Sequence, residues 1–326
     1  MLERDETIRR VPEEVQIAAA RAESDLGKFI LVRLVGKGGM GEVHQAWDKE
    51  LGRFVAIKLI PSPTEEERRR FVREAQVAAK LDHPNIVPVY DVGITERAAF
   101  IAMKFVQGTT LDRAPLTLRQ KVTALRDAAR AVAFAHHEGV IHRDLKPQNI
   151  LVESPEASPK VYLTDFGLAR QVSLETSLSV SGVVVGTPQY MSPEQALGRP
   201  KEVDERSDVY SLRATLYALL GGAAPFGGDD LLGTLRRVVE EDPHPLRLMN
   251  PSLPRELETI VMKCLEKEKT RRYAGPAELA DDLDRWLAGW IPRRPGRPPA
   301  SRRCVSRSRN GSGRTRWKQT GARPRP

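Results

Sequence analysis

The stretch Val140-Ile141-His142-Arg143-Asp144-Leu145-Lys146-Pro147-Gln148-Asn149 decides how the rest of the chain is interpreted. It places a carboxylate, Asp144, five positions before an amide, Asn149, on a loop that leads into the apolar run 150–152. A carboxylate can address a substrate hydroxyl while an amide oxygen helps to bind a magnesium ion. The loop therefore favours phosphoryl transfer, provided that the other groups this chemistry requires are present elsewhere in the chain.

A glycine-rich run precedes this loop in the sequence. Residues 29–35 are apolar enough for a strand, and they lead into Gly36-Lys37-Gly38-Gly39-Met40-Gly41-Glu42-Val43. Glycine lets backbone amides approach phosphates without interference from a Cβ. A dinucleotide-binding loop would open a helix here, whereas residues 44–47 continue as a strand. We expect a hairpin over phosphates, with an ordinary flexible hairpin as the alternative.

Two further charged residues fit the same chemistry. Lys58 lies inside the apolar strand predicted over residues 54–60, where an ammonium needs an anion. Glu74, at the edge of the apolar face of the next predicted helix, can supply that anion. Asp165-Phe166-Gly167 follows sixteen residues after Asn149, and Asp165 can serve as a magnesium ligand. Further helices are predicted at 118–138, 208–220, 231–240, 255–265 and 276–288.

Composition indicates a globular protein with room for one large or two smaller domains in its 326 residues. No apolar run reaches about 18 residues, and the charged start lacks the apolar core of a signal peptide. We therefore expect a cytoplasmic protein that does not contact membranes. Cys264 and Cys304 lie far apart, which predicts neither a disulfide framework nor a zinc site.

The net charge of +9 is concentrated in one segment. Residues 291–326 contain eleven arginines, one lysine and no acidic residue, so the rest of the chain is mildly acidic. This segment is also rich in proline, serine and glycine, and such a composition cannot bury enough apolar surface to fold. Nucleic-acid binding through this tail is an open alternative function. Its abrupt start after Gly289 also suggests the hypothesis of a shifted reading frame.

In this order, the motifs resemble those of the eukaryotic-like (Hanks-type) protein kinases. The glycine-rich run with Met40 is most similar to the bacterial serine/threonine kinases of the PknB-like group, and Lys146 is typical of the serine/threonine class. The resemblance covers about residues 29–288. It implies an α+β fold with two lobes, a small β-sheet N-lobe with one main helix and a larger, mainly α-helical C-lobe.

The resemblance also implies a division of the chain. We expect a leader at 1–27, poorly ordered or a short helix without a clear core face, and a kinase domain at 28–289. The N-lobe is expected at about 28–103, the hinge at 104–108, the C-lobe at 109–289 and a disordered Arg/Pro-rich tail at 290–326.

The implied reaction is transfer of the γ-phosphoryl group of ATP, with Mg²⁺, to serine or threonine hydroxyls of proteins. By resemblance, Asp144 orients the hydroxyl proton, Lys146 steadies the transferred group, and Asn149 and Asp165 hold magnesium. Lys58 binds the phosphates and pairs with Glu74. The implied ATP site consists of Val35, Gly36, Gly38, Gly41, Val43, Ala56, Lys58, Met103, Phe105, Val106 and Leu151.

An activation segment is implied between Asp165 and Glu194. It contains the candidate phosphorylation sites Ser173, Thr176 and Ser177, and Thr187 as a residue that docks the substrate. A second copy of the chain, in a transient homodimer, is the expected phosphorylating partner. The resemblance also implies structural roles for Arg143 as a grip on the loop phosphate, Glu194 paired with Arg272, and Asp208 as the anchor of the catalytic loop.

Several residues depart from the family pattern, including Ser192, which stands where alanine is most common. Ala78 is smaller than usual. Lys104 stands where an acidic residue is common, and because the backbone of the hinge would bind adenine, we expect this change to have little effect on ATP binding. Ala218 removes a glutamate that many relatives use to recognise basic substrates. Arg213 replaces a glycine in a buried helix, which is destabilising unless its stem carries the guanidinium to the surface. A pseudokinase scaffold and a small-molecule phosphotransferase remain as alternatives.

Overall fold

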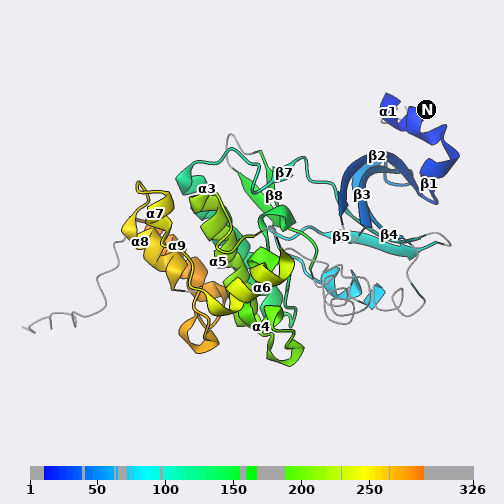
Figure 1. Cartoon of the computed structure of the whole chain (residues 1–326). Coiled ribbons are helices and arrows are strands. Elements are labelled where there is room, and N and C mark those ends of the chain that lie inside the picture. Colours follow the sequence, from blue (N-terminus) through cyan, green and yellow to red (C-terminus); the bar gives the residue numbers. More distant parts are fainter. Residues whose placement is uncertain are drawn as a thin grey trace, which may run out of the picture. The chain divides into compact units, whose positions relative to one another are not determined.

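The structure of the chain is a computed structural model that describes residues 11–38, 41–61, 64, 72–73, 75–95, 98–154, 159–166, 188–228, 230–263 and 265–289. The N-lobe contains an antiparallel sheet with the strand order β1-β2-β3-β4-β6-β5 (Figure 1). Its strands are β1 (Asp25–Leu26), β2 (Phe29–Gly38), β3 (Gly41–Asp48), β4 (Arg53–Pro61), β5 (Val89–Ile94) and β6 (Ala98–Lys104).

Alternation of side chains along β4 gives this sheet two distinct faces. Val55 and Ile57 are fully buried on one face, within the core cluster of the N-lobe. Ala56 and Lys58 point to the opposite face. Ala56 and its partner on β6, Met103, pack in one cluster with Tyr162 of the C-lobe, so this second face is turned toward the C-lobe.

A short helix, α1 (Glu13–Ala19), lies before the sheet and packs against β2. Its Val15 and Ala18 side chains are buried. The expectation that this segment has no clear core face is therefore wrong. Two buried residues on a single face are too few to give a periodic signal over so short a helix.

The C-lobe combines a small sheet with helices. The sheet consists of β7 (Gly108–Thr110), β8 (Ile150–Glu153) and β9 (Lys160–Leu163), paired in that order. The helices are α3 (Leu118–His137), α4 (Pro193–Ala196), α5 (Glu205–Gly221), α6 (Leu231–Glu240), α7 (Leu246–Met249), α8 (Arg255–Met262) and α9 (Pro276–Leu287). Five 3-10 turns are also described: η1 (Ala22–Ser24), η2 (Pro147–Asn149), η3 (Pro188–Tyr190), η4 (Pro200–Glu202) and η5 (Lys269–Arg271).

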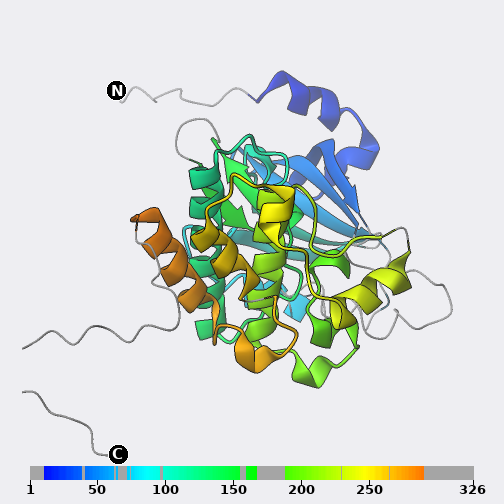
Figure 2. The ribbon, with the colours of Figure 1, turned by 60° about the vertical axis from the view of Figure 1, so that its left-hand side comes forward.

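Helix α5 runs through the core of this lobe, and its side chains are buried on nearly all sides. Helix α3 packs against α5 and, on another side, against α9, as Figures 1 and 2 show. A capping box between Thr117 and Gln120 starts α3, and Gly139 follows its end with a φ of 76°. This long helix leads the chain directly into the loop at 140–149.

The predicted α+β architecture of two lobes is confirmed. The main helix expected in the N-lobe falls on residues that are only partly described, 72–73 and 75–78 being helical. The expected tail at 290–326 lies outside the described residues. Within the described part of the chain, no helix has the length and apolarity needed to cross a membrane.

Candidate active site

The loop at 140–149 gathers two polar side chains around one carboxylate oxygen. Lys146 Nζ lies 2.9 Å from Asp144 Oδ2, and Asn149 Nδ2 donates to the same oxygen at 2.9 Å. Asn149 reaches Asp144 because the turn η2 folds the chain back, and its Nδ2 also donates to the Asp144 carbonyl oxygen at 2.7 Å. The Asp144 and Lys146 side chains are each 16% exposed, so this cluster is accessible to a substrate.

Asp208 of α5 anchors the backbone of the loop. Its fully buried carboxylate accepts hydrogen bonds from the amides of His142 and Arg143, each at 2.8 Å, and lies 2.7 Å from His136 Nε2. Burial raises the pKa of Asp208, but the contact with His136 and the other hydrogen bonds outweigh burial and lower it overall. Arg143 has a φ of 70°, an unfavourable left-handed conformation, which the two-amide contact with Asp208 stabilises.

Asp165 lies where the lobes meet. Its Oδ1 is 2.6 Å from Lys58 Nζ of the N-lobe, and the Lys58 side chain is only 5% exposed. Burial raises the pKa of Asp165, but Lys58, together with His142 and Lys146, lowers it, so the pKa is below its usual value overall. Phe166 packs on the His142 ring with 4.6 Å between ring centroids, and His142 Nε2 lies 3.0 Å from the Thr164 carbonyl oxygen. Asp165 and Phe166 are thereby fixed to the loop at 140–149.

Some of the predicted site residues lie outside the described residues. These are Glu74, expected to pair with Lys58, and the activation-segment residues Ser173, Thr176, Ser177 and Thr187.

An apolar cluster lies between the N-lobe sheet and β8–β9, next to Lys58. It contains most of the side chains expected around the adenine ring of ATP: Val43, Ala56, Met103, Phe105, Val106 and Leu151. Val35 is half exposed on β2 and is not part of this cluster. Gly36 and Gly38 also lie in β2. Gly41 has a φ of 117°, and a Cβ there would stand 2.0 Å from the Leu59 carbonyl oxygen, so only glycine fits.

Two members of this cluster, Val87 and Tyr162, were not predicted from the sequence. Tyr162 faces Leu151 across the β8–β9 pair. The alternation of residues 160–163 could have indicated that Tyr162 shares a face with the pocket, because neighbours across a strand pair lie on the same side. Val87 gives no comparable signal, since it lies in a connection before β5.

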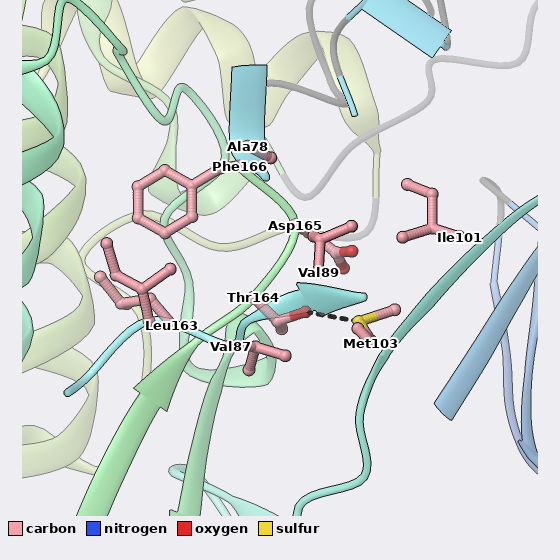
Figure 3. A pocket seen from close by; sticks show the side chains of 10 residues that line it. Ala78, Val87, Val89, Ile101, Met103, Leu163, Thr164, Asp165 and Phe166 are labelled. Atoms are coloured by element: carbon pink, nitrogen blue, oxygen red, sulfur yellow. Dashed lines mark hydrogen bonds between the residues drawn. The ribbon is translucent and has the colours of Figure 1, made fainter. Parts of the chain in front are cut away.

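A cavity lies next to Met103, and Val87, Val89 and Ile101 also line it (Figure 3). Thr164 Oγ1 lies 3.9 Å from Met103 Sδ on its wall, and Asp165 and Phe166 line it as well. Ala78, the small residue that departs from the family pattern, also lines this cavity. A larger side chain at Ala78 would fill part of this space.

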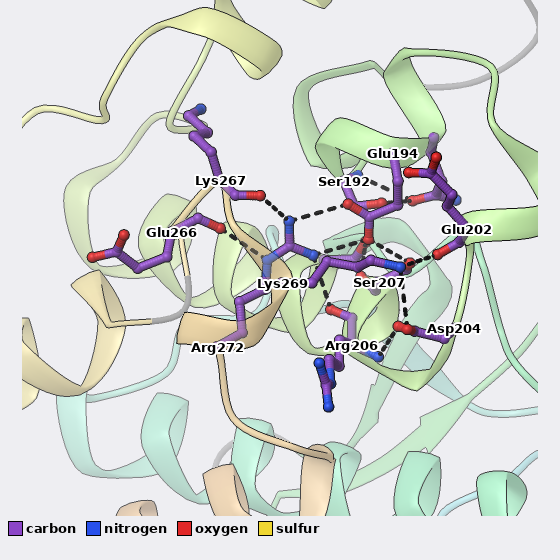
Figure 4. A network of polar contacts seen from close by, with 12 residues as sticks. Ser192, Glu194, Glu202, Asp204, Arg206, Ser207, Glu266, Lys267, Lys269 and Arg272 are labelled. Carbon is purple, nitrogen blue, oxygen red and sulfur yellow. Dashed lines mark hydrogen bonds and ion pairs between the residues drawn. The ribbon is translucent and has the colours of Figure 1, made fainter.

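A buried ion pair joins α4 to the loop before α9 (Figure 4). Arg272 Nη1 and Nη2 lie 2.9 and 3.1 Å from the two carboxylate oxygens of Glu194. Ser207 Oγ donates to Glu194 at 2.6 Å, and Arg272 also donates to the carbonyl oxygens of Glu266 and Lys267, both at 2.9 Å. Burial raises the pKa of Glu194, but Arg272 and Ser207 lower it overall.

A sheet lobe and a helical lobe that bring together Lys58, Asp165, Asp144 and Asn149 define a two-lobed kinase-like domain. The chain belongs to the protein kinase domain family, which matches residues 29–282. The predicted resemblance to bacterial Hanks-type serine/threonine kinases is confirmed by this match and by the relatives.

Two curated relatives and one solved structure illustrate the similarity. The serine/threonine-protein kinase PknB of Mycobacterium leprae (strain TN) is 40% identical over 280 residues, which are 82% of this chain and 44% of that protein. The probable serine/threonine-protein kinase PknB of Lactococcus lactis subsp. lactis (strain IL1403) is 39% identical over 265 residues, 78% of this chain and 41% of that protein. The crystal structure of the Mycobacterium tuberculosis PknI kinase domain has a TM-score of 0.62 and 29% identity, covering 80% of this chain and 96% of that one. The chain thus spans less than half the length of the curated relatives it matches.

Proposed function

We propose that this chain is an ATP-dependent protein kinase that phosphorylates serine and threonine hydroxyls of other proteins. The observation that carries the proposal is the convergence of Lys146 Nζ and Asn149 Nδ2 on Asp144 Oδ2, each at 2.9 Å. The PknB relatives are named serine/threonine-protein kinases, which supports this substrate class.

In this proposal Asp144 orients the substrate hydroxyl and accepts its proton as the new oxygen–phosphorus bond forms, while the bond from the γ-phosphorus to the β–γ bridging oxygen breaks and ADP leaves. Lys146, beside Asp144, offsets the negative charge that develops on the transferred group. Asp144 thus contributes positioning and Lys146 contributes charge stabilisation, the two effects that dominate phosphoryl transfer by kinases. Asp208 contributes indirectly, because it fixes the backbone of Arg143 immediately before Asp144.

The groups proposed to hold Mg²⁺ are the Asp165 carboxylate and the amide oxygen of Asn149. The donors fit this ion, because Mg²⁺ prefers oxygen ligands and completes its shell with phosphates and water. Asn149 uses its Nδ2 for Asp144, so its amide oxygen is the atom suited to a cation. When bound, the ion would neutralise phosphate charge during transfer.

The ATP phosphates are proposed to lie between the glycine hairpin and Lys58, with the adenine ring in the apolar cluster around Ala56 and Met103. Burial of Lys58 beside Asp165 supports this, because it aims a cation at the point where metal and phosphates would meet. Glu74 is proposed as a further partner of Lys58. ATP as the phosphoryl donor also supports a cytoplasmic location for the domain, for which we propose the bounds 28–289.

A transfer assay tests the activity. Purified protein is incubated with labelled ATP, Mg²⁺ and a generic protein substrate, and Asp144→Asn is expected to lower the rate by about 10²–10⁴-fold. Glu240→Gln, which changes a carboxylate with a 56% exposed side chain, is the matched control and should keep the wild-type rate. Unchanged transfer by Asp144→Asn would refute the assignment. ATP binding without transfer by the wild type would instead favour the pseudokinase alternative.

We also propose that phosphorylation of Ser173, Thr176 or Ser177 by a second copy of the chain activates the kinase. Arg143 supports this, because its position next to Asp144 would couple a loop phosphate to the catalytic loop through a charge-assisted contact. An active copy should phosphorylate the inactive Asp144→Asn copy at these sites, as detected by mass spectrometry. A dephosphorylated enzyme with full activity would contradict the regulatory role.

A further inference from the structure

A polar cluster of three side chains links the last strand of the N-lobe sheet to the small sheet of the C-lobe. Lys104, the final residue of β6, donates from Nζ to Tyr162 Oη at 2.5 Å and lies 3.6 Å from Glu153 Oε1. Tyr162 Oη donates to Glu153 Oε2 at 3.1 Å. Each side chain therefore contacts the other two, although the three come from β6, β8 and β9.

The environment of this cluster strengthens it relative to an ordinary surface ion pair. The Lys104 and Glu153 side chains are 28% and 29% exposed, and Tyr162 is only 3% exposed. Burial lowers the pKa of Lys104, but Tyr162 and Glu153 raise it by more, so the ammonium is retained at neutral pH. Partial exclusion of water also reduces the screening that weakens exposed pairs.

The cluster is connected to the proposed nucleotide pocket at two points. The Tyr162 ring packs in the same apolar cluster as Ala56, Met103 and Val106. Lys104 directly follows Met103 and begins the segment 104–108 that joins the lobes. A movement of the end of β6 relative to β9 would therefore change the width of the pocket, and the three-residue cluster opposes this movement.

We propose that Lys104 is a positioning residue that holds the end of β6 against β8 and β9 and thereby sets the affinity for the nucleotide. The proposal rests on ATP being the ligand of the proposed kinase. Residues that connect lobes absorb the backbone changes of domain closure, and contacts that restrict them alter ligand binding. The catalytic loop is anchored separately by Asp208, so kcat should depend less on Lys104 than nucleotide affinity does.

The test compares variants of the full chain by calorimetry with a non-hydrolysable ATP analogue. Lys104→Met keeps an apolar stem without the ammonium and should weaken binding by about 5-fold or more, about 1 kcal/mol. KM for ATP should rise in parallel while kcat stays within about twofold. Lys104→Arg, which can still donate to Tyr162 and Glu153, should restore the affinity.

Combining Lys104→Met with Tyr162→Phe should weaken binding by less than the product of the two single effects, because both remove the same link.

The matched control is Lys28→Met. Lys28 pairs with Asp91 at 2.7 Å with a similarly exposed side chain, and both residues belong to the N-lobe. Unchanged affinity in Lys104→Met, or an equal loss in Lys28→Met, would overturn the proposal. If the wild type binds the analogue but transfers no phosphate, the kinase activity is refuted. The role of Lys104 is then still decided by the comparison of the binding affinities. Absence of analogue binding by the wild type would overturn the role of Lys104 in nucleotide affinity.

Discussion

At the residue scale, Arg272 and Glu194 stabilise the C-lobe only as a pair. The Arg272 side chain is fully buried and the Glu194 side chain is 4% exposed, so neither charge can be hydrated if the other is lost. Removal of one partner of a buried pair costs far more than the pair contributes over an apolar replacement. The free energy of unfolding should therefore be sensitive to a single substitution here.

Arg272→Met is expected to lower the free energy of unfolding by about 3–5 kcal/mol, because it leaves the Glu194 carboxylate buried and unpaired. Urea denaturation measures this difference. Arg236→Met, a change at a 76% exposed side chain in an i,i+4 pair, is the control and should stay within about 0.5 kcal/mol. Equal losses in the two variants would show that the buried pair has no special role.

Acidification should weaken the same pair. The folded-state pKa of Glu194 lies below its usual value of 4.5, so its contribution to stability is complete above pH 4.5 and is lost as pH falls through the folded pKa. Below pH 4.5 the wild type should lose stability more steeply than Glu194→Gln, as measured by Tm against pH. Parallel curves for the two proteins would contradict this prediction.

The catalytic-loop motif grouped Asp144 with Asn149, and the family resemblance implied that Glu194 pairs with Arg272; the structure has both contacts. These residues carry a recognisable pattern even when they are far apart in the chain. Lys104 shows where such reasoning ends. Its change from the common acidic residue was expected to matter little, yet the structure pairs it with Glu153 and Tyr162. A contact between strands of different sheets leaves no periodic signal in the sequence.

At the scale of elements, α5 contains a buried charged side chain that is unfavourable for stability. Arg213 is fully buried, so the alternative that its stem carries the guanidinium to the surface is wrong. Within the described residues, none of its three nitrogens has a hydrogen-bond partner. Its Cζ lies 4.7 Å from the centroid of the Tyr273 ring, and this cation–π contact offsets only part of the desolvation cost.

Arg213→Met should therefore raise the free energy of unfolding by about 1–4 kcal/mol, because methionine fills similar space, favours helix and carries no charge. Tm should rise by about 2–4 °C for each kcal/mol in a domain of this size. Arg236→Met again serves as the control, since it removes an exposed arginine from α6. A clear loss of stability in Arg213→Met would show that the guanidinium has a favourable partner beyond the described residues.

The longer helices of the C-lobe were predicted from apolar spacing or a stop signal, whereas the four-residue helices α4 and α7 were not predicted. The range 231–240 agrees with α6, and the expected helix at 276–288 differs from α9 by one residue. The range 255–265 was too long, since α8 ends at Met262. Helix α1 has only Val15 and Ala18 as buried residues, and two positions cannot establish a period.

At the scale of the whole molecule, the proposed chemistry needs both lobes, because Lys58 comes from one and Asp144 and Asp165 from the other. The family resemblance predicted this division, since the glycine-rich run and Lys58 precede the hinge and the acidic motifs follow it. The contacts that fix one lobe on the other, such as the contact of Lys104 with Tyr162, could not be predicted from the sequence. Interlobe contacts depend on how the two sheets face each other, and no local sequence pattern encodes that.

The basic tail at 290–326 should be dispensable for catalysis. The family match ends at residue 282 and α9 ends at Leu287, so every proposed catalytic residue lies upstream of the tail. Truncation after Gly289 is expected to leave kcat/KM within about twofold, less than about 0.5 kcal/mol in the barrier. The same pair of proteins tests nucleic-acid binding, because contacts of arginine with phosphates should make any DNA affinity fall steeply with salt and disappear on truncation. A large loss of kinase activity in the truncated protein would instead show that the arginine-rich segment contributes to the reaction.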